Sequence, residues 1–88
     1  MVQPTVDVKD PGASKEKAPF VSRPRTKGAK FIPNGYNNCY NENDEIWQDG
    51  EFRNGQLWDG KVYTYDFDGI LLKVKIYKQG VYHSDGQL

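Results

Sequence analysis

Six of the nine glycines in this chain directly follow an Asn or an Asp, and all six lie after residue 33. They are Gly35, Gly50, Gly55, Gly60, Gly69 and Gly86. Asn-Gly and Asp-Gly pairs adopt the positive backbone φ angles of tight hairpin turns at low steric cost. The runs between them are short and rich in aromatic and β-branched residues, which favours strands. We therefore predict an all-β domain built from hairpins.

The clearest strand signal is the run ILLKVKIY over residues 70–77. Its apolar side chains recur at every second position, which is typical of a strand with one buried face. We expect four of these side chains to face the core. They are Ile70, Leu72, Val74 and Ile76.

The chain also contains an internal repeat, because residues 34–58 align with residues 59–83 without a gap. Three residues are identical in the alignment: Gly35 aligns with Gly60, Tyr40 with Tyr65, and Gly55 with Gly80. Asn54-Gly55 is expected to close a hairpin inside the first unit, and Asp59-Gly60 to start the second unit. The prediction is an antiparallel meander of two stacked β-hairpin repeats over residues 31–88.

The pattern NG, YNEND, GEFRNGQLWDGKVYTYDFDG and YKQG resembles the MORN repeat (membrane occupation and recognition nexus), in its bacterial variant, over about residues 34–86. The resemblance implies stacked β-hairpins that serve as an interaction scaffold, and some members are labelled antitoxin-like. Repeat folds generally need about three units to bury a continuous core. Two units are therefore expected to depend on a homo-oligomeric mate or on a larger assembly.

Residues 1–30 differ from the rest in composition and charge. All five prolines lie in the first 33 residues, and residues 1–30 carry seven basic and three acidic groups, a net charge of +4. The remaining residues carry five basic and nine acidic groups, a net charge of −4. The first segment has no apolar period and too few apolar residues to offset its ordering entropy. We predict an extended or disordered basic arm over residues 1–30.

Five residues of this arm are predicted to bind a partner: Phe20, Arg23, Arg25, Lys27 and Lys30. An acidic surface of a neighbouring protein subunit is the favoured partner. A solvated linker and a nucleic-acid contact are the alternatives, and nucleic acid ranks below protein because the arm lacks interleaved aromatics and a DNA-reading motif.

In the body, three aromatic residues near predicted turns are candidates for partner contact: Trp58, Phe67 and Tyr82. Exposed aromatic side chains are frequent anchors of protein interfaces. The other rings are expected mainly to pack inside the sheet.

No catalytic, cofactor or metal site is expected. Cys39 and His83 are each the single residue of their type, which excludes an internal disulfide and gives too few ligands for a structural zinc site. Neither Cys39 nor Ser84 is embedded in a nucleophile motif. Asp66 and Asp68 resemble part of a calcium loop, but both also suit a hairpin turn, which is the favoured interpretation.

We therefore expect a non-enzymatic structural or adaptor protein, anchored by its arm to a larger assembly, such as an accessory subunit of a viral or phage particle. The alternative is an intracellular, antitoxin-like protein that masks a partner protein. No signal peptide and no membrane span are predicted from the apolar pattern, so we expect the cytoplasm, a virion or a large intracellular assembly.

Overall fold

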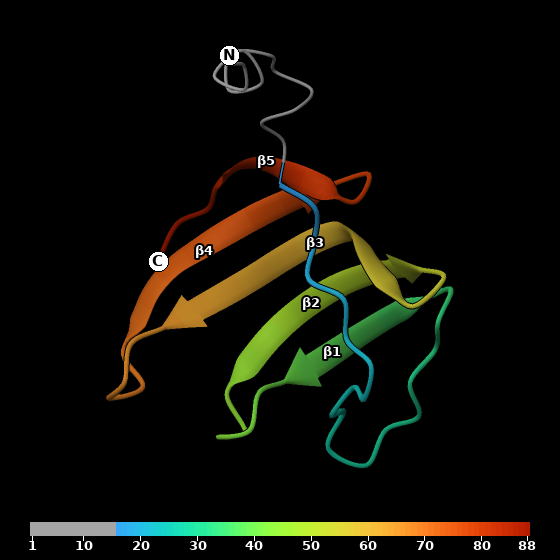
Figure 1. The fold of residues 1–88 in the computed structure, drawn as a ribbon, viewed down its shortest axis with the longest axis horizontal. Coiled ribbons are helices and arrows are strands. Elements are labelled where there is room, and N and C mark those ends of the chain that lie inside the picture. Colours follow the sequence, from blue (N-terminus) through green and yellow to red (C-terminus); the bar gives the residue numbers. More distant parts are fainter. Residues whose placement is uncertain (1–15) are drawn as a thin grey trace, which may run out of the picture.

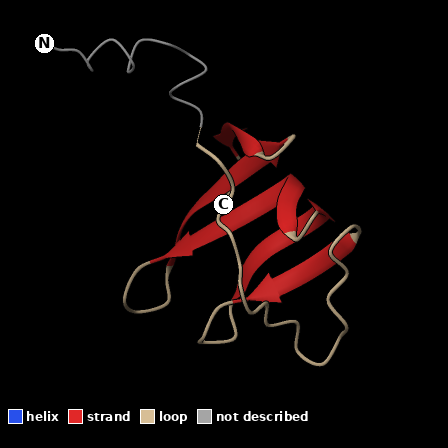
Figure 2. Ribbon diagram, turned by 45° about the vertical axis from the view of Figure 1, so that its right-hand side comes forward, coloured by secondary structure: helices blue, strands red, loops and turns tan. Residues whose placement is uncertain are grey.

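The structure, a computed structural model, describes residues 16–88, whose strands form a single antiparallel sheet (Figure 1). Each strand pairs with the next along the chain, in the order β1-β2-β3-β4-β5. No helix occurs in this range (Figure 2). The predicted all-β meander is confirmed. Its strands are β1 (Tyr36–Tyr40), β2 (Ile46–Arg53), β3 (Gln56–Tyr65), β4 (Leu71–Lys78) and β5 (Val81–Asp85).

Two of the connections are tight turns with two consecutive positive φ angles. Asn54 and Gly55, with φ of 51° and 82°, join β2 to β3. Gln79 and Gly80, with φ of 54° and 83°, join β4 to β5. Two positive φ angles are the mark of a type I′ turn, whose twist matches that of the flanking strands. The hairpin predicted at Asn54-Gly55 is confirmed.

The other two connections are closed by an Asx side chain. Asn41 Oδ1 accepts hydrogen bonds from the backbone N–H groups two and four residues later, at 2.9 and 3.0 Å. Asp66 Oδ1 accepts the two equivalent bonds, both at 2.9 Å. Such Asx bonds fold the backbone into a turn. The interpretation of Asp66 as a turn residue is confirmed.

The internal repeat extends to the irregularities of strand pairing. β4 begins and ends 25 residues after β2. Trp47 and Leu72, which are 25 residues apart, are the extra residues of two register shifts. Trp58 and His83 occupy the equivalent places in the other two shifts. The two units therefore have the same arrangement of strands, turns and bulges, although few of their residues are identical.

The expectation for Asp59-Gly60 is wrong, because this pair lies within β3 rather than in a turn. Gly60 pairs with Gly50 of β2 and with Tyr77 of β4. A Cβ atom on Gly60 would collide with the carbonyl oxygen of Asp49 and lie 2.8 Å from Gly50 Cα. These glycines allow two strand backbones to approach closely, which is the other common use of glycine in strands.

Residues 16–30, here called the crossing segment, cross one face of the sheet from β5 to β1 (Figure 1). Ala18 N donates a hydrogen bond to Gly80 O at 3.0 Å, and Tyr40 N donates to Arg25 O at 2.8 Å. The second half of the predicted arm, residues 16–30, thus pairs with the sheet of the body, and residues 1–15 lie outside the described range. Three isolated bridges connect the segment to the sheet: Lys17 with Val81, Phe20 with Gln56, and Arg25 with Tyr40.

The core lies on the face that the crossing segment covers, here called the covered face. Ala18 of the segment is 4% exposed and belongs to this core. Phe31, just after the segment, packs edge-to-face on Phe52, with ring centroids 5.4 Å apart. The segment thus adds a second layer to a single sheet, which supplies a core without a partner chain. The buried core residues are Ala18, Cys39, Phe52, Leu57, Val62 and Tyr77.

The predicted inward face of residues 70–77 is therefore wrong in part. Ile70 and Leu72 are 59% and 56% exposed. Val74 is buried, but on the face opposite Val62, where Gly86 packs beside Val74 and the partly buried Ile76. The alternation is present, but the crossing segment covers the face that carries Val62 and Tyr77.

Candidate binding surface

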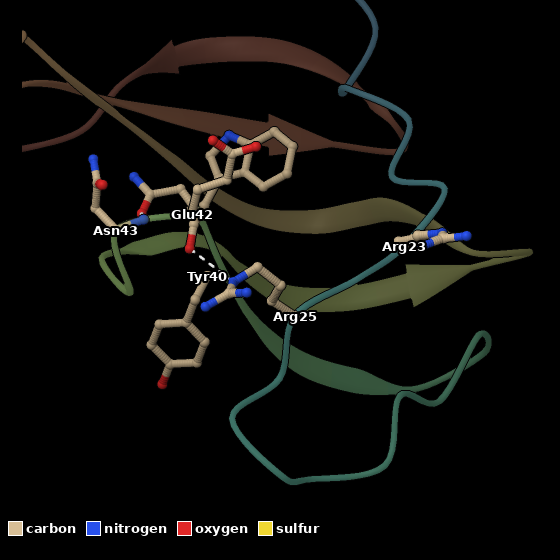
Figure 3. A pocket seen from close by; sticks show the side chains of 7 residues that line it. Arg23, Arg25, Tyr40, Glu42 and Asn43 are labelled. Atoms are coloured by element: carbon tan, nitrogen blue, oxygen red, sulfur yellow. Dashed lines mark hydrogen bonds between the residues drawn. The ribbon is translucent and has the colours of Figure 1, made fainter.

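A hollow of about 610 Å³ lies between the crossing segment and the turn that joins β1 to β2 (Figure 3). We call it the Trp47 crevice. Its walls come from parts of the chain that are distant in sequence, and they combine aromatic, basic and acidic side chains. The lining residues are Arg23, Arg25, Tyr40, Asn41, Glu42, Asn43 and Trp47.

Arg25 fastens the crossing segment to this turn. Its Nη2 atom lies 2.6 Å from Asp44 Oδ1, and its Nε atom donates to Asn41 O at 3.0 Å (dashed line in Figure 3). Because its backbone carbonyl also accepts from Tyr40 N, Arg25 holds three groups of β1 and the turn. A half-exposed ion pair contributes little stability alone, but several directed bonds fix the geometry of the wall.

Trp47 and Tyr40 supply the aromatic surface of the crevice. Trp47 is the extra residue of a register shift in β2, and it packs partly buried against the core. Bulges of this kind change the direction of a side chain relative to regular strand alternation. Lys27 Nζ lies 4.3 Å from the centroid of the Tyr40 ring, a cation–π contact.

The five predicted arm residues are spread over the crossing segment rather than gathered. Arg23 and Arg25 line the Trp47 crevice, with Arg23 pointing away from Arg25 (Figure 3). Lys27 and Lys30 line a second hollow described below. Phe20 is exposed and bridges Gln56 on β3.

The three predicted aromatics of the body do not line the Trp47 crevice. Phe67 is fully exposed at the turn between β3 and β4. Trp58 is partly buried, with Arg53 Cζ 4.8 Å from its ring centroid. Tyr82 packs edge-to-face on Tyr77 at 6.2 Å and borders the core. Of the three, Phe67 presents the most surface to a partner.

Sequence reasoning missed Ala18, Tyr40 and Trp47. A single alanine in a Pro- and Lys-rich segment carries no periodic signal that marks it as a core residue. Trp47 could have been found as a special position only from the pairing register, since its repeat mate is Leu72, an aliphatic residue.

The candidate nucleophiles and the histidine lie at two different places in the sheet. Cys39 is fully buried, and burial raises the pKa of its thiol, which disfavours the reactive thiolate. His83 Nδ1 lies 3.1 Å from Ser84 Oγ, both on β5 and outside the crevice. Within residues 16–88, no group of three or more His, Cys, Asp or Glu side chains is placed to hold a metal ion.

Comparison with protein-family models, with curated proteins and with solved structures gives no match for this chain. A helix able to span a membrane is also absent from residues 16–88.

Proposed function

We propose that this chain is a non-enzymatic adaptor, a MORN-like module of two hairpin units that binds a partner protein through the Trp47 crevice. The observation that carries the proposal is that Trp47, Tyr40 and two arginines line one hollow. Trp, Tyr and Arg are the residue types most enriched among the energetic centres of protein interfaces. A larger assembly, such as a viral or phage particle, is the proposed setting.

The construction of the crevice supports binding rather than catalysis. Its charged side chains carry both signs, and Arg25 is already engaged with Asp44. Its aromatic surface is held by the core on one side and by the crossing segment on the other. A rigid wall of this kind loses little conformational entropy on binding, which favours affinity.

Site-specific photo-crosslinking in the producing cells tests the proposal. A photoreactive phenylalanine analogue replaces Arg23 or Asn43, which line the crevice, and Lys78, which is exposed on β4, as the matched control. We expect the two crevice positions to capture the same partner protein, and the Lys78 position to capture it weakly or not at all. Equal capture from all three positions, or none from any, contradicts the proposal.

Two substitutions separate binding from folding. Trp47→Ala removes the aromatic wall, but it also removes a side chain that borders the core. Arg23→Glu changes only an exposed side chain of the same crevice. Both variants are expected to lose the crosslink made from position 43, and Arg23→Glu is expected to keep the thermal stability of the parent chain. A crosslink that survives Arg23→Glu and Trp47→Ala would place the interface elsewhere.

A further inference from the structure

In the part of the chain that the structure describes, no strand pairs with the outer edge of β1. β1 is the first strand of the sheet and has only β2 as a neighbour in the ladder. Phe52 N donates to Gly35 O at 2.8 Å, and bonded pairs alternate along an antiparallel ladder. Asn37 and Cys39 therefore face β2, whereas Tyr36, Asn38 and Tyr40 direct their N–H and C=O groups outward.

The crossing segment pairs with only the last of these three residues. Tyr40 N donates to Arg25 O at 2.8 Å, which confirms the outward direction. The chain then leaves the edge at a turn in which Ala29 N donates to Thr26 O. Within residues 16–88, the outward backbone groups of Tyr36 and Asn38 have no backbone partner outside the β1–β2 ladder. The edge is thus paired at one end and open at the other.

The open part of the edge borders a hollow of about 430 Å³, here called the β1 edge groove. Its far wall is the end of the crossing segment together with the first residues of the loop that follows it. Two lysines line the groove and no acidic residue does. Neither Lys27 nor Lys30 has an ion-pair partner among residues 16–88. The lining residues are Thr26, Lys27, Ala29, Lys30, Ile32, Tyr36, Asn37, Asn38 and Tyr40.

The lysines do not act as a simple guard against edge-to-edge pairing. Proteins commonly protect an exposed edge with Lys or Pro on the edge strand itself. β1, with the sequence YNNCY, has neither residue. The two lysines of the groove lie on the wall opposite β1. The groove therefore offers backbone pairing along one wall and positive charge along the other.

We propose that the β1 edge groove binds an extended acidic segment of a partner protein, which adds to the sheet beside Tyr36 and Asn38. Main-chain bonds to an exposed sheet edge give affinity in this mode, and alternate side chains give specificity. Acidic side chains facing Lys27 and Lys30 supply that specificity. The phosphates of a nucleic acid would pair with the two lysines, but a nucleic acid lacks the peptide groups that pair with the strand edge. The inference concerns a surface separate from the Trp47 crevice and does not rest on it, although Tyr40 lines both.

The test uses the full chain, labelled with ¹⁵N, and a blocked Val-Glu-Val-Glu-Val peptide as the probe. We expect shift changes centred on the Tyr36 and Asn38 amides and, at saturation, about tenfold slower hydrogen exchange at both. Two control peptides isolate the components of binding. One replaces each Glu by Lys, and the other carries N-methyl groups on the amides that would pair. Both are expected to bind at least about tenfold more weakly.

Variants of the protein complete the test. Lys27→Glu together with Lys30→Glu is expected to weaken binding of the probe about tenfold or more, while Lys78→Glu leaves it unchanged. Asn38→Pro removes one outward N–H at a position where an edge strand tolerates proline, and it is expected to weaken binding similarly. The charge variants keep the test decisive if Asn38→Pro lowers stability.

Four results would overturn the inference. The first is equal binding of the N-methylated or the lysine peptide, and the second is a set of shift changes centred away from β1. The third is protection of both amides in the chain without probe, which would mean that the edge is already occupied. The fourth is the same shift pattern produced by a single-stranded oligonucleotide, which would assign the lysines to phosphate binding.

Discussion

At the scale of single residues, Gln48 departs from ordinary strand chemistry. Its side chain is 0% exposed, and its amide oxygen and nitrogen make no hydrogen bond within residues 16–88. The register places Gln48 between Cys39 and Val62 on the covered face. From the sequence, a Gln between Trp47 and Asp49 reads as a solvent-facing residue. Its burial on the covered face is a property of the folded chain that the neighbouring sequence does not indicate.

Gln48→Met is expected to stabilise the protein by about 1 kcal/mol or more, because it removes a buried amide without a partner and keeps a similar volume. Urea unfolding followed by circular dichroism measures the change. A loss of stability would show that the amide has a bound partner in solution.

Glu16 links the start of the crossing segment to β4. Tyr77 Oη donates to Glu16 Oε2 at 2.8 Å, and Lys75 Nζ lies 3.1 Å from the same oxygen. The hydrogen bond from Tyr77 lowers the pKa of Glu16 most, and the bond from Lys75 lowers it further. Burial, and then the Glu16 carboxylate, raise the pKa of Tyr77. A carboxyl group whose pKa is lowered by folding stabilises the folded state while it is ionised.

The pH dependence of stability follows from this sign. The contribution of Glu16 is present above the ordinary carboxyl pKa and is lost as the pH falls through the lowered value. Glu16→Gln should therefore lower Tm modestly at pH 7, because the pair is partly solvent-screened, and this loss of Tm should shrink as the pH falls through the lowered carboxyl pKa. Thermal unfolding from pH 3 to 7 checks this, with Glu42→Gln as the control. An effect of equal size at pH 3 and pH 7 would contradict the role of the charge.

At the scale of the elements, the Asx-Gly pairs serve two different purposes. Asn54-Gly55 forms a tight turn, whereas Gly50 and Gly60 face each other across β2 and β3. A tight turn and a close approach of two strands both need a residue without Cβ. The Asx-Gly dipeptide alone therefore does not show which of the two it serves. The all-β hairpin meander could still be predicted, because the turn signals at Asn54-Gly55 and Asp66 and the alternation over residues 70–77 are present in the structure.

Gly60→Ala is expected to destabilise the protein by about 3 kcal/mol, because the added Cβ meets backbone atoms that cannot repack. Gly55→Asn is the control, since Asn accepts positive φ and nothing lies within 4 Å of the added Cβ at that position. Chemical unfolding of the two variants gives the comparison. Similar costs at both positions would contradict the close approach of β2 and β3.

At the scale of the whole molecule, the crossing segment turns a single sheet into a two-layer fold. Its residues could not be placed from sequence because they have no apolar period, and Ala18 contributes burial through its small size. The Trp47 crevice was equally beyond prediction, since Arg23 and Trp47 meet only through this crossing. The sequence indicates that the basic residues of the segment are candidates for binding, but it does not indicate which residues of the sheet lie beside them.

Removal of residues 1–30 is expected to abolish cooperative unfolding, because it uncovers Phe52, Leu57 and Val62 on a sheet too small to be stable alone. Ala18→Asp in the full chain should cause a related loss of stability, since it buries an unpaired charge. Calorimetry of both proteins against the parent chain makes the comparison. A shortened chain that unfolds with unchanged cooperativity would show that the segment is dispensable.

The central claim, that the crossing segment is part of the fold, is tested most directly by native-state hydrogen exchange. Three amides cross between the segment and the sheet, those of Ala18, Tyr40 and Tyr82, with bonds to Gly80 O, Arg25 O and Glu16 O. The predicted result is exchange at these amides slowed by about two orders of magnitude or more relative to an unfolded chain. Exchange of all three at the unfolded-chain rate, while the amides of β3 remain protected, would contradict it.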